Sequence, residues 1–230
     1  MARYRFQLLL SALFILLLTY PLLHMLPIPS NWSSNIASIF FSLVLLAAVL
    51  AVSQRRITGI IVLCVYVLTA LLEVISVYYK SSSLQIVDHS LSAIYLSGII
   101  IIILYNMFYV AKITFDTICA ALSVYLLMAV LWAVLYALVD AVSPGSFTFN
   151  SQIGSGTSVM YFDEKLSMVP LYYSLVTITT LGYGDIVPVT PMASMLAAVE
   201  AVIGQFYLTV LVAWLVGMHI STSIRHKTTS

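Results

Sequence analysis

The sequence predicts an all-α membrane protein, and two observations carry that prediction. Of the 230 residues, 62% are hydrophobic and only 7% are charged, which is not the composition of a water-soluble domain. The apolar residues also form unbroken runs of about 20, the length that an α-helix needs to cross a bilayer. A transmembrane β-barrel would show alternating apolar and polar residues instead, so helices are the expected spanning elements.

Six apolar runs are long enough to span a bilayer. The first follows Arg3 and Arg5 and is succeeded by Pro27 and Pro29. A cleaved signal sequence also has a basic start and an apolar core, and this alternative stays open. We favour a retained helix, because the run is longer than a signal's core and lacks a clear small-residue cleavage site. The six predicted spans are residues 6–26, 36–52, 57–79, 90–110, 113–142 and 192–220.

One further apolar segment is too short to span. Residues 143–165 are rich in Gly and Ser and end in Asp163, Glu164 and Lys165, so they are too polar to cross. The apolar segment 166–179 follows them. A helix of about 14 residues is about 21 Å long, less than the hydrocarbon thickness of about 30 Å. We therefore expect a re-entrant helix, which enters and leaves the membrane on the same side.

The basic residues predict the orientation, because cytoplasmic loops carry an excess of Lys and Arg. If the N-terminus is cytoplasmic, only Lys80 and Lys165 lie outside. Both termini are then cytoplasmic, the re-entrant segment lies on the outer side, and the expected location is the cell membrane. The basic residues predicted to lie inside are Arg3, Arg5, Arg55, Arg56, Lys112, Arg225 and Lys227.

Several classes of function are not supported by the composition. The net charge of +1 provides no basic face for nucleic acid. Cys64 and Cys119 each lie alone in an apolar run, which favours buried thiols without a disulfide or a metal. The four histidines show no metal-ligand spacing, and no group of residues suggests catalysis. We expect a protein that is not an enzyme and has no cofactor.

The stretch 177–185 reads Thr-Ile-Thr-Thr-Leu-Gly-Tyr-Gly-Asp and lies between the re-entrant segment and the last span. Glycine at alternate positions permits backbone conformations that other residues resist. Successive carbonyl oxygens can then point to one side, and four such columns around an axis can replace the water shell of a monovalent cation. The alternative is a simple glycine turn between two helices.

Within this stretch, Thr180-Leu181-Gly182-Tyr183-Gly184 resembles the Thr-Val-Gly-Tyr-Gly signature of tetrameric potassium channels, with Leu in place of Val. The resemblance covers about residues 113–220. It implies a homotetramer and a pore domain, residues 111–230, with an outer helix, a pore loop at 166–185 and an inner helix at 192–220. It also implies that the five residues form a selectivity filter, with K⁺ at Thr180, Leu181, Gly182 and Tyr183.

The resemblance assigns supporting residues as well. Tyr172 and Tyr173 stand where the family has an aromatic pair that braces the filter, so we expect hydrogen bonds from Tyr172 to Asp185 and from Tyr173 to Tyr183. The alternative is that both tyrosines lie at the membrane interface. A ring of four Asp185 carboxylates would concentrate cations at the outer mouth. Thr179 and Glu200 complete the expected filter support, although the sequence names no partner for Glu200.

Two glycines of the last span are candidates for gating. Gly204 lies 20 residues after Gly184, at the position of the family's hinge glycine. A packing contact explains a glycine in a membrane helix equally well, so both interpretations stay open. Gly217 would let four inner helices approach one another near the cytoplasmic end. The residues expected to face the cavity or neighbouring helices are Gln205, Leu208, Val212 and Val216.

Residues 1–110 are predicted to form a four-helix peripheral domain, a layout that resembles voltage-gated channels. That plan needs Arg or Lys at every third position of the fourth span, and residues 92–110 contain none. Steep voltage dependence is therefore not expected. The join at 111–116 is too short for a long linker helix, so the peripheral helices should pack on the pore of their own subunit or of a near neighbour. Glu73 and the tyrosines of spans three and four could line a polar pocket, although interface anchoring explains the tyrosines better.

Together these features predict a potassium-selective channel that conducts K⁺ passively and is not steeply voltage-gated. The alternatives are a non-conducting regulatory subunit of another channel and a weakly selective cation channel. The expected partners are three further copies, K⁺ ions and membrane lipids. Only about ten residues follow residue 220, so regulation by a ligand-binding domain would need a separate chain.

Overall fold

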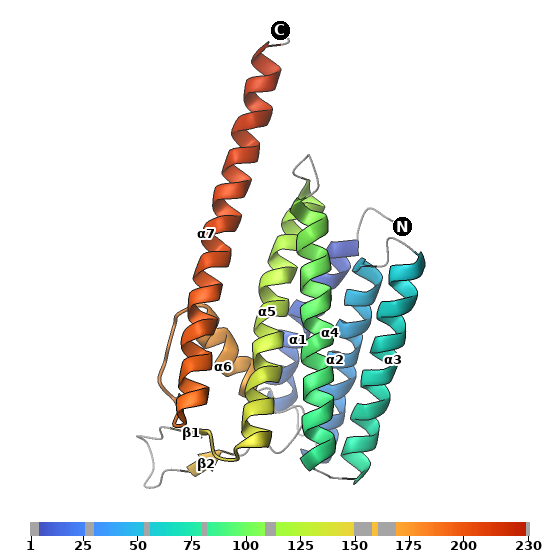
Figure 1. Cartoon of the computed structure of the whole chain (residues 1–230), viewed down its shortest axis with the longest axis vertical. Helices are drawn as coiled ribbons and strands as arrows, with labels where there is room; N and C mark the ends of the chain where they lie inside the picture. Colours follow the sequence, from blue (N-terminus) through green and yellow to red (C-terminus); the bar gives the residue numbers. More distant parts are fainter. Residues whose placement is uncertain are drawn as a thin grey trace.

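The computed structural model describes residues 5–25, 30–52, 56–79, 82–108, 114–149, 158–160 and 169–228. Five long helices form a bundle, and a sixth, α7, leans away from it with the short helix α6 lying between α7 and α5 (Figure 1). The helices are α1 (Arg5–Met25), α2 (Ser30–Val52), α3 (Arg56–Tyr79), α4 (Ser82–Phe108), α5 (Phe115–Val142), α6 (Val169–Ile178) and α7 (Pro191–Thr228).

Four of these helices are long and apolar enough, over their described residues, to cross a membrane: α3, α4, α5 and α7. The described apolar stretches of α1 and α2, Arg5–Thr19 and Phe41–Val52, are shorter. Together the apolar helices indicate a membrane protein. The six-span count stays a prediction, and so does the re-entrant path of α6, which has 10 residues.

Two helices extend eight residues beyond the predicted spans, and α2 begins at Ser30, six residues before its predicted start. α4 begins at Ser82 instead of residue 90, so that Asp88 and His89 lie inside the helix, where both are buried. α7 continues to Thr228 instead of ending near residue 220. In both cases polar residues form helix, because backbone hydrogen bonds do not depend on an apolar side chain.

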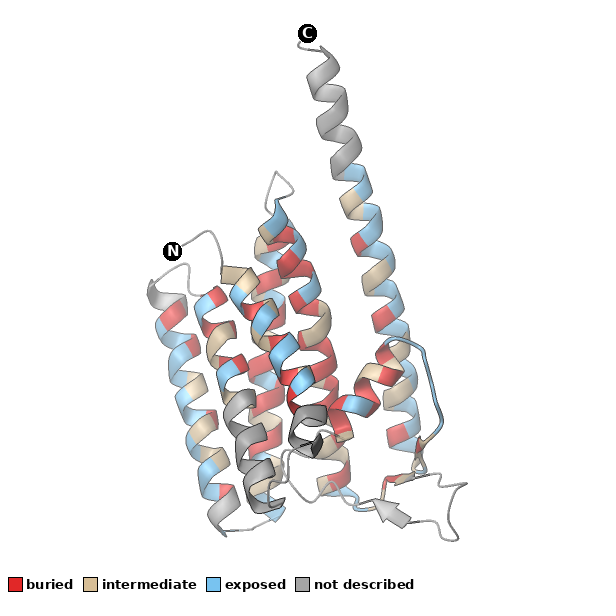
Figure 2. Ribbon diagram, turned by 180° about the vertical axis from the view of Figure 1, so that it is seen from behind, coloured by how far each residue is buried: buried red, intermediate tan, exposed pale blue. Residues whose placement is uncertain are grey.

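Helix α5 is the centre of the fold. It packs against α1, α4, α6 and α7, and 67% of its span is buried, compared with 22% for α3 and for α7 (Figure 2). Its first turn is fixed by Thr114, whose hydroxyl accepts the amide proton of Thr117 in a capping box. Helices α1 and α4 thus pack on α5 of the same chain.

The all-α prediction is wrong in one detail, because the chain also contains a small antiparallel sheet. Its strand order is β2 (Ser158–Met160), β1 (Phe147–Phe149), β3 (Ile186–Pro188). Residues 143–149, predicted to belong to a polar loop, include β1, and β3 follows the predicted filter directly. Thr148 pairs with Val187 at the centre of the β1–β3 register. The sheet therefore links the end of α5 to the chain that leaves the filter.

Candidate functional site

Residues of the predicted filter alternate between left-handed and right-handed backbone conformations. Thr180, Gly182 and Gly184 have positive φ angles of 58°, 58° and 74°, whereas Leu181 and Tyr183 do not. In a β-strand successive carbonyls point to opposite sides, but alternation of left- and right-handed residues turns them to the same side. This is the backbone arrangement that a column of oxygen ligands requires.

The inner end of the filter also terminates helix α6. The amide of Leu181 donates to the carbonyl oxygen of Val176 at 2.9 Å, and the amide of Thr180 donates to that of Thr177 at 2.9 Å. These two bonds define a Schellman motif, in which the residue with positive φ is usually glycine. Here it is Thr180, a β-branched residue that resists this conformation. Position 180 therefore carries backbone strain.

The carbonyl oxygens of the predicted filter accept no hydrogen bond from the part of the chain that the structure describes. Among the described residues, no hydrogen bond is recorded to a carbonyl from Thr180 to Gly184. The side chains of Leu181 and Tyr183 are 55% and 66% exposed in the single chain, and this segment runs along the side of α7 that faces away from the bundle (Figures 1 and 2). An unsatisfied backbone group in lipid costs several kcal/mol, so these oxygens must face water, an ion or another chain.

Asp185 fixes the C-terminal end of the predicted filter. Its Oδ2 accepts a hydrogen bond from the hydroxyl of Tyr172 at 2.7 Å, as predicted, and its Oδ1 accepts one from the amide of Ile186 at 3.0 Å. The bond to Asp185 raises the pKa of Tyr172 to about 12, so the phenol remains a donor at physiological pH. Asp185 thus joins the first half of α6 to the start of β3.

The second predicted brace has a different partner in the single chain. No hydrogen bond is recorded between Tyr173 and Tyr183 among the described residues. The ring of Tyr173 is buried and packs edge-on against Tyr136 of α5 and Phe147 of β1, with centroid separations of 4.9 and 5.4 Å. The rings of Phe147 and Tyr136 also pack edge-on, with a centroid separation of 5.5 Å. This three-ring cluster, which no sequence pattern predicted, ties α6 to α5 and to the sheet.

Glu200, for which the sequence named no partner, is fully buried and has two. Its Oε2 accepts a hydrogen bond from the hydroxyl of Tyr136, and its Oε1 lies 2.5 Å from the hydroxyl oxygen of Ser174. The Ser174 hydroxyl also lies 2.8 Å from the carbonyl oxygen of Ala129. Neither Tyr136 nor Ser174 was predicted, although both are polar residues inside apolar segments, which is the signal that could have identified them.

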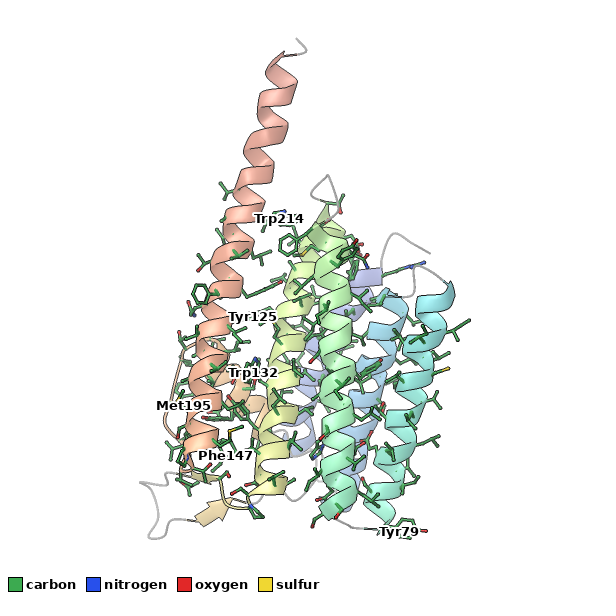
Figure 3. All side chains as sticks on the ribbon, viewed as in Figure 1. Tyr79, Tyr125, Trp132, Phe147, Met195 and Trp214 are labelled. Carbon is green, nitrogen blue, oxygen red and sulfur yellow. The ribbon has the colours of Figure 1, made fainter. Side chains whose placement is uncertain are left out.

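The C-terminal end of α6 is held from two sides. Gly204 of α7 lies against Ile178, and the hydroxyl of Tyr125 of α5 donates to the carbonyl oxygen of Ile178 at 3.2 Å. The ring of Tyr125, which lies between α5 and α7 (Figure 3), stacks on the ring of Tyr207 of α7 with a centroid separation of 6.0 Å. The hydroxyl of Thr179 donates back to the carbonyl oxygen of Leu175 at 2.6 Å. By contrast, nothing lies within 4 Å of the position that a Cβ would take at Gly217.

The residues predicted to face the cavity are open in the single chain. Gln205, Val212 and Val216 are exposed and Leu208 is half-buried, so these positions of α7 remain available to a pore or to another copy. In the peripheral half, Glu73 lines a small cavity together with Asp88, His89, Ser92 and the start of α6 at Pro170. The cavity supports the polar-pocket interpretation for Glu73, but its recorded lining includes none of the tyrosines of spans three and four.

One comparison with known proteins gives a match. Residues 112–219 match the family model described as ion channel, which is just under half of the chain. The match supports an ion channel of the pore-loop kind. It covers α5, α6, the filter segment and most of α7, and it fits a membrane protein that conducts ions and is not an enzyme. No curated protein and no solved structure matches the chain.

Proposed function

We propose that four copies of this chain form a potassium-selective channel, in which the carbonyls of Thr180, Leu181, Gly182, Tyr183 and Gly184 bind K⁺. The observation that carries the proposal is the filter backbone, with positive φ at alternate residues and no donor to its carbonyls among the described residues. Such oxygens, arranged around an axis, can replace the hydration shell of K⁺. The Thr180 hydroxyl would provide the innermost ligands.

A homotetramer follows from the same oxygens. A single chain supplies one carbonyl at each level, which cannot surround an ion, and it leaves polar backbone exposed in a chain built for lipid. Four copies around a common axis would enclose the filter and place Asp185 in a ring at the outer mouth. The exposed apolar side chains of α7 beside the filter, such as Val199 and Val202, would then contact neighbouring copies.

The topology belongs to the same proposal. We place six spans, α1 to α5 and α7, in the cell membrane, with α6 re-entrant from the outer side and both termini cytoplasmic. Residues 1–110 would form the peripheral domain and residues 111–230 the pore. The described part of α4 carries no Arg or Lys, which supports a channel without steep voltage dependence.

Flux through reconstituted protein tests the proposal. Purified protein in liposomes should pass K⁺ and Tl⁺ much faster than Na⁺, and Ba²⁺ should block the flux. Gly182→Ala should abolish it, because position 182 has φ of +58°, a backbone conformation that glycine adopts readily and alanine resists. Within one chain a Cβ at this position has open space around it. Gly98→Ala is the matched control, since Gly98 also has open space but no positive φ, and it should leave the flux unchanged.

The other outcomes separate the alternatives. Equal flux of Na⁺ and K⁺ would replace the proposal by a weakly selective cation channel. A stable tetramer without any flux would favour a non-conducting regulatory subunit. A monomer or dimer in native mass spectrometry would overturn the tetramer and the filter together.

A further inference from the structure

Three helices meet at the side chain of Glu200. The residue is on α7, Ser174 is on α6, and Tyr136 and Ala129 are on α5. The carboxyl group is fully buried, and it is bonded to the hydroxyls of Ser174 and Tyr136. Within the described residues the recorded ion pair is between Asp88 and His89, so no cation is seen to compensate a charge on Glu200. An ionised carboxylate buried in this way is strongly destabilising.

The Ser174 hydroxyl has a single proton, and this limits the protonation states that Glu200 can have. The Ser174 oxygen lies 2.8 Å from the Ala129 carbonyl oxygen and 2.5 Å from Oε1 of Glu200. A carbonyl only accepts, an ionised carboxylate only accepts, and a serine hydroxyl donates a single proton. If Glu200 were ionised, one of these two short contacts would join two acceptors with no proton between them.

A proton on Glu200 satisfies every group at once. The carboxylic acid donates through Oε1 to Ser174, Ser174 donates to the Ala129 carbonyl, and Tyr136 donates to Oε2. Each hydroxyl then donates once, and the buried carbonyl of Ala129, which faces α6, keeps its additional partner. The described titratable side chains of α5 and α6 that interact with Glu200 are Tyr125 and Tyr136 of α5 and Tyr173 of α6. None of the three supplies a positive charge.

We propose that Glu200 is a neutral carboxylic acid at physiological pH, and that its proton links α7 to α6 and α5 through the chain Glu200–Ser174–Ala129. Ser174 precedes Val176 and Ile178, whose carbonyls accept from the filter amides and from Tyr125. The chain of bonds therefore sets the position of α6 and, through it, the inner end of the filter. Glu200 is a positioning residue, and its effect on conduction rests on the function proposed above.

Infrared difference spectroscopy of the tetramer in lipid tests the protonation directly. Wild-type protein at neutral pH should show the C=O band of a protonated carboxylic acid, and Glu200→Gln should remove that band. Asp88→Asn is the matched control, a buried carboxyl in α4, and should leave the Glu200 band in place. Tyr136→Phe should keep the band but shift it, because the acid loses the donor to Oε2. An ionised Glu200, with no band that depends on residue 200, would overturn the proposal.

Substitutions at Glu200 test the positioning role. Glu200→Ala should lower K⁺ flux by about tenfold or more, since it removes the buried hydrogen bonds that hold α6 against α7. Glu200→Gln should restore most of that loss, because its amide nitrogen donates to Ser174 and its oxygen accepts from Tyr136, as the neutral acid does. If Gln behaves like Ala, the neutral-acid arrangement is wrong. Because the infrared band does not depend on conduction, protein that shows the band but passes no K⁺ would contradict only the proposed function.

Discussion

Gly204 of α7 lies so close to Ile178 of α6 that a Cβ at position 204 would be 2.6 Å from the Ile178 carbonyl oxygen. Real Cβ atoms do not approach backbone that closely, so glycine is required at this contact. Ile178 is the last residue of α6, directly before Thr179 and the filter. The packing interpretation of Gly204 thus has a structural basis, and α7 is an unbroken helix from Pro191 to Thr228. The hinge interpretation stays a prediction.

Gly204→Ala should destabilise the folded subunit, and Gly217→Ala should not. The added methyl at 204 must displace Ile178 or α7, which costs about 1–3 kcal/mol in a packed interior. At 217 a Cβ meets nothing within 4 Å, and alanine improves helix propensity by up to about 1 kcal/mol. Thermal unfolding in detergent measures both variants. If the two variants were equally stable and only Gly204→Ala changed channel opening, the hinge interpretation of Gly204 would be favoured.

Thr180→Gly should separate stability from ion binding. Relief of the left-handed conformation of Thr180 gains about 1–2 kcal/mol, which exceeds the entropic penalty of glycine of about 0.5–1 kcal/mol. The variant should therefore be at least as stable as wild type in Na⁺, but should lose part of the added stability that K⁺ provides. Thr180→Ser, which keeps the hydroxyl, should retain the K⁺ effect. Melting curves in the two salts measure this, and a Gly variant stabilised by K⁺ as fully as wild type would exclude a role for the hydroxyl.

Tyr172 and Asp185 should be energetically coupled. Tyr172→Phe removes the donor to Oδ2, and Asp185→Asn weakens the acceptor. We expect a coupling of about 1 kcal/mol, at the low end for a bond to a charged group, because Tyr172 is 37% exposed. A double-mutant cycle on the rate at which K⁺ current decays during sustained conduction gives the value. Additive effects would mean that the bond does not hold the filter.

Voltage should have little effect on opening. Each elementary charge moved across the membrane is worth about 2.3 kcal/mol per 100 mV, and the described part of α4 has no Arg or Lys to move. We expect an effective gating charge below about one elementary charge per channel. Steady-state open probability measured in planar bilayers between negative and positive potentials provides the test. A steep sigmoidal rise on depolarisation would show that other charges sense the field.

The long helices were predictable because their signal is local. An apolar run of sufficient length predicts a helix in lipid without knowledge of its neighbours, and α3 and α5 agree with the expected spans within two residues at each end. The start of α4 was predicted eight residues too late, because Asp88 and His89 are polar residues of the kind found in loops. Both are buried beside a cavity that Glu73 of another helix also lines, and no local pattern reveals that neighbourhood.

The supports of the filter were only partly predictable, for the same reason. Tyr172 and Asp185 are 13 residues apart, and the family motif includes both. Glu200 bonds to Tyr136 and Ser174, which are 64 and 26 residues away, and the β1–β3 pairing joins segments on either side of α6. Such contacts arise only when α5, α6 and α7 are packed together, so the sequence indicated that Glu200 needs partners but not which ones.

The length of α7 has a mechanical consequence. The helix has 38 residues, about 57 Å at 1.5 Å per residue, while its tight contact with α6 lies near the outer end. About 36 Å of helix extends from Gly204 to Thr228, so a rigid tilt of about 10° around that contact would carry the far end through about 6 Å. In the proposed tetramer, such a tilt would move the C-terminal ends of the four α7 helices apart without bending any helix, while the residues near the contact of Gly204 with Ile178 would stay almost still.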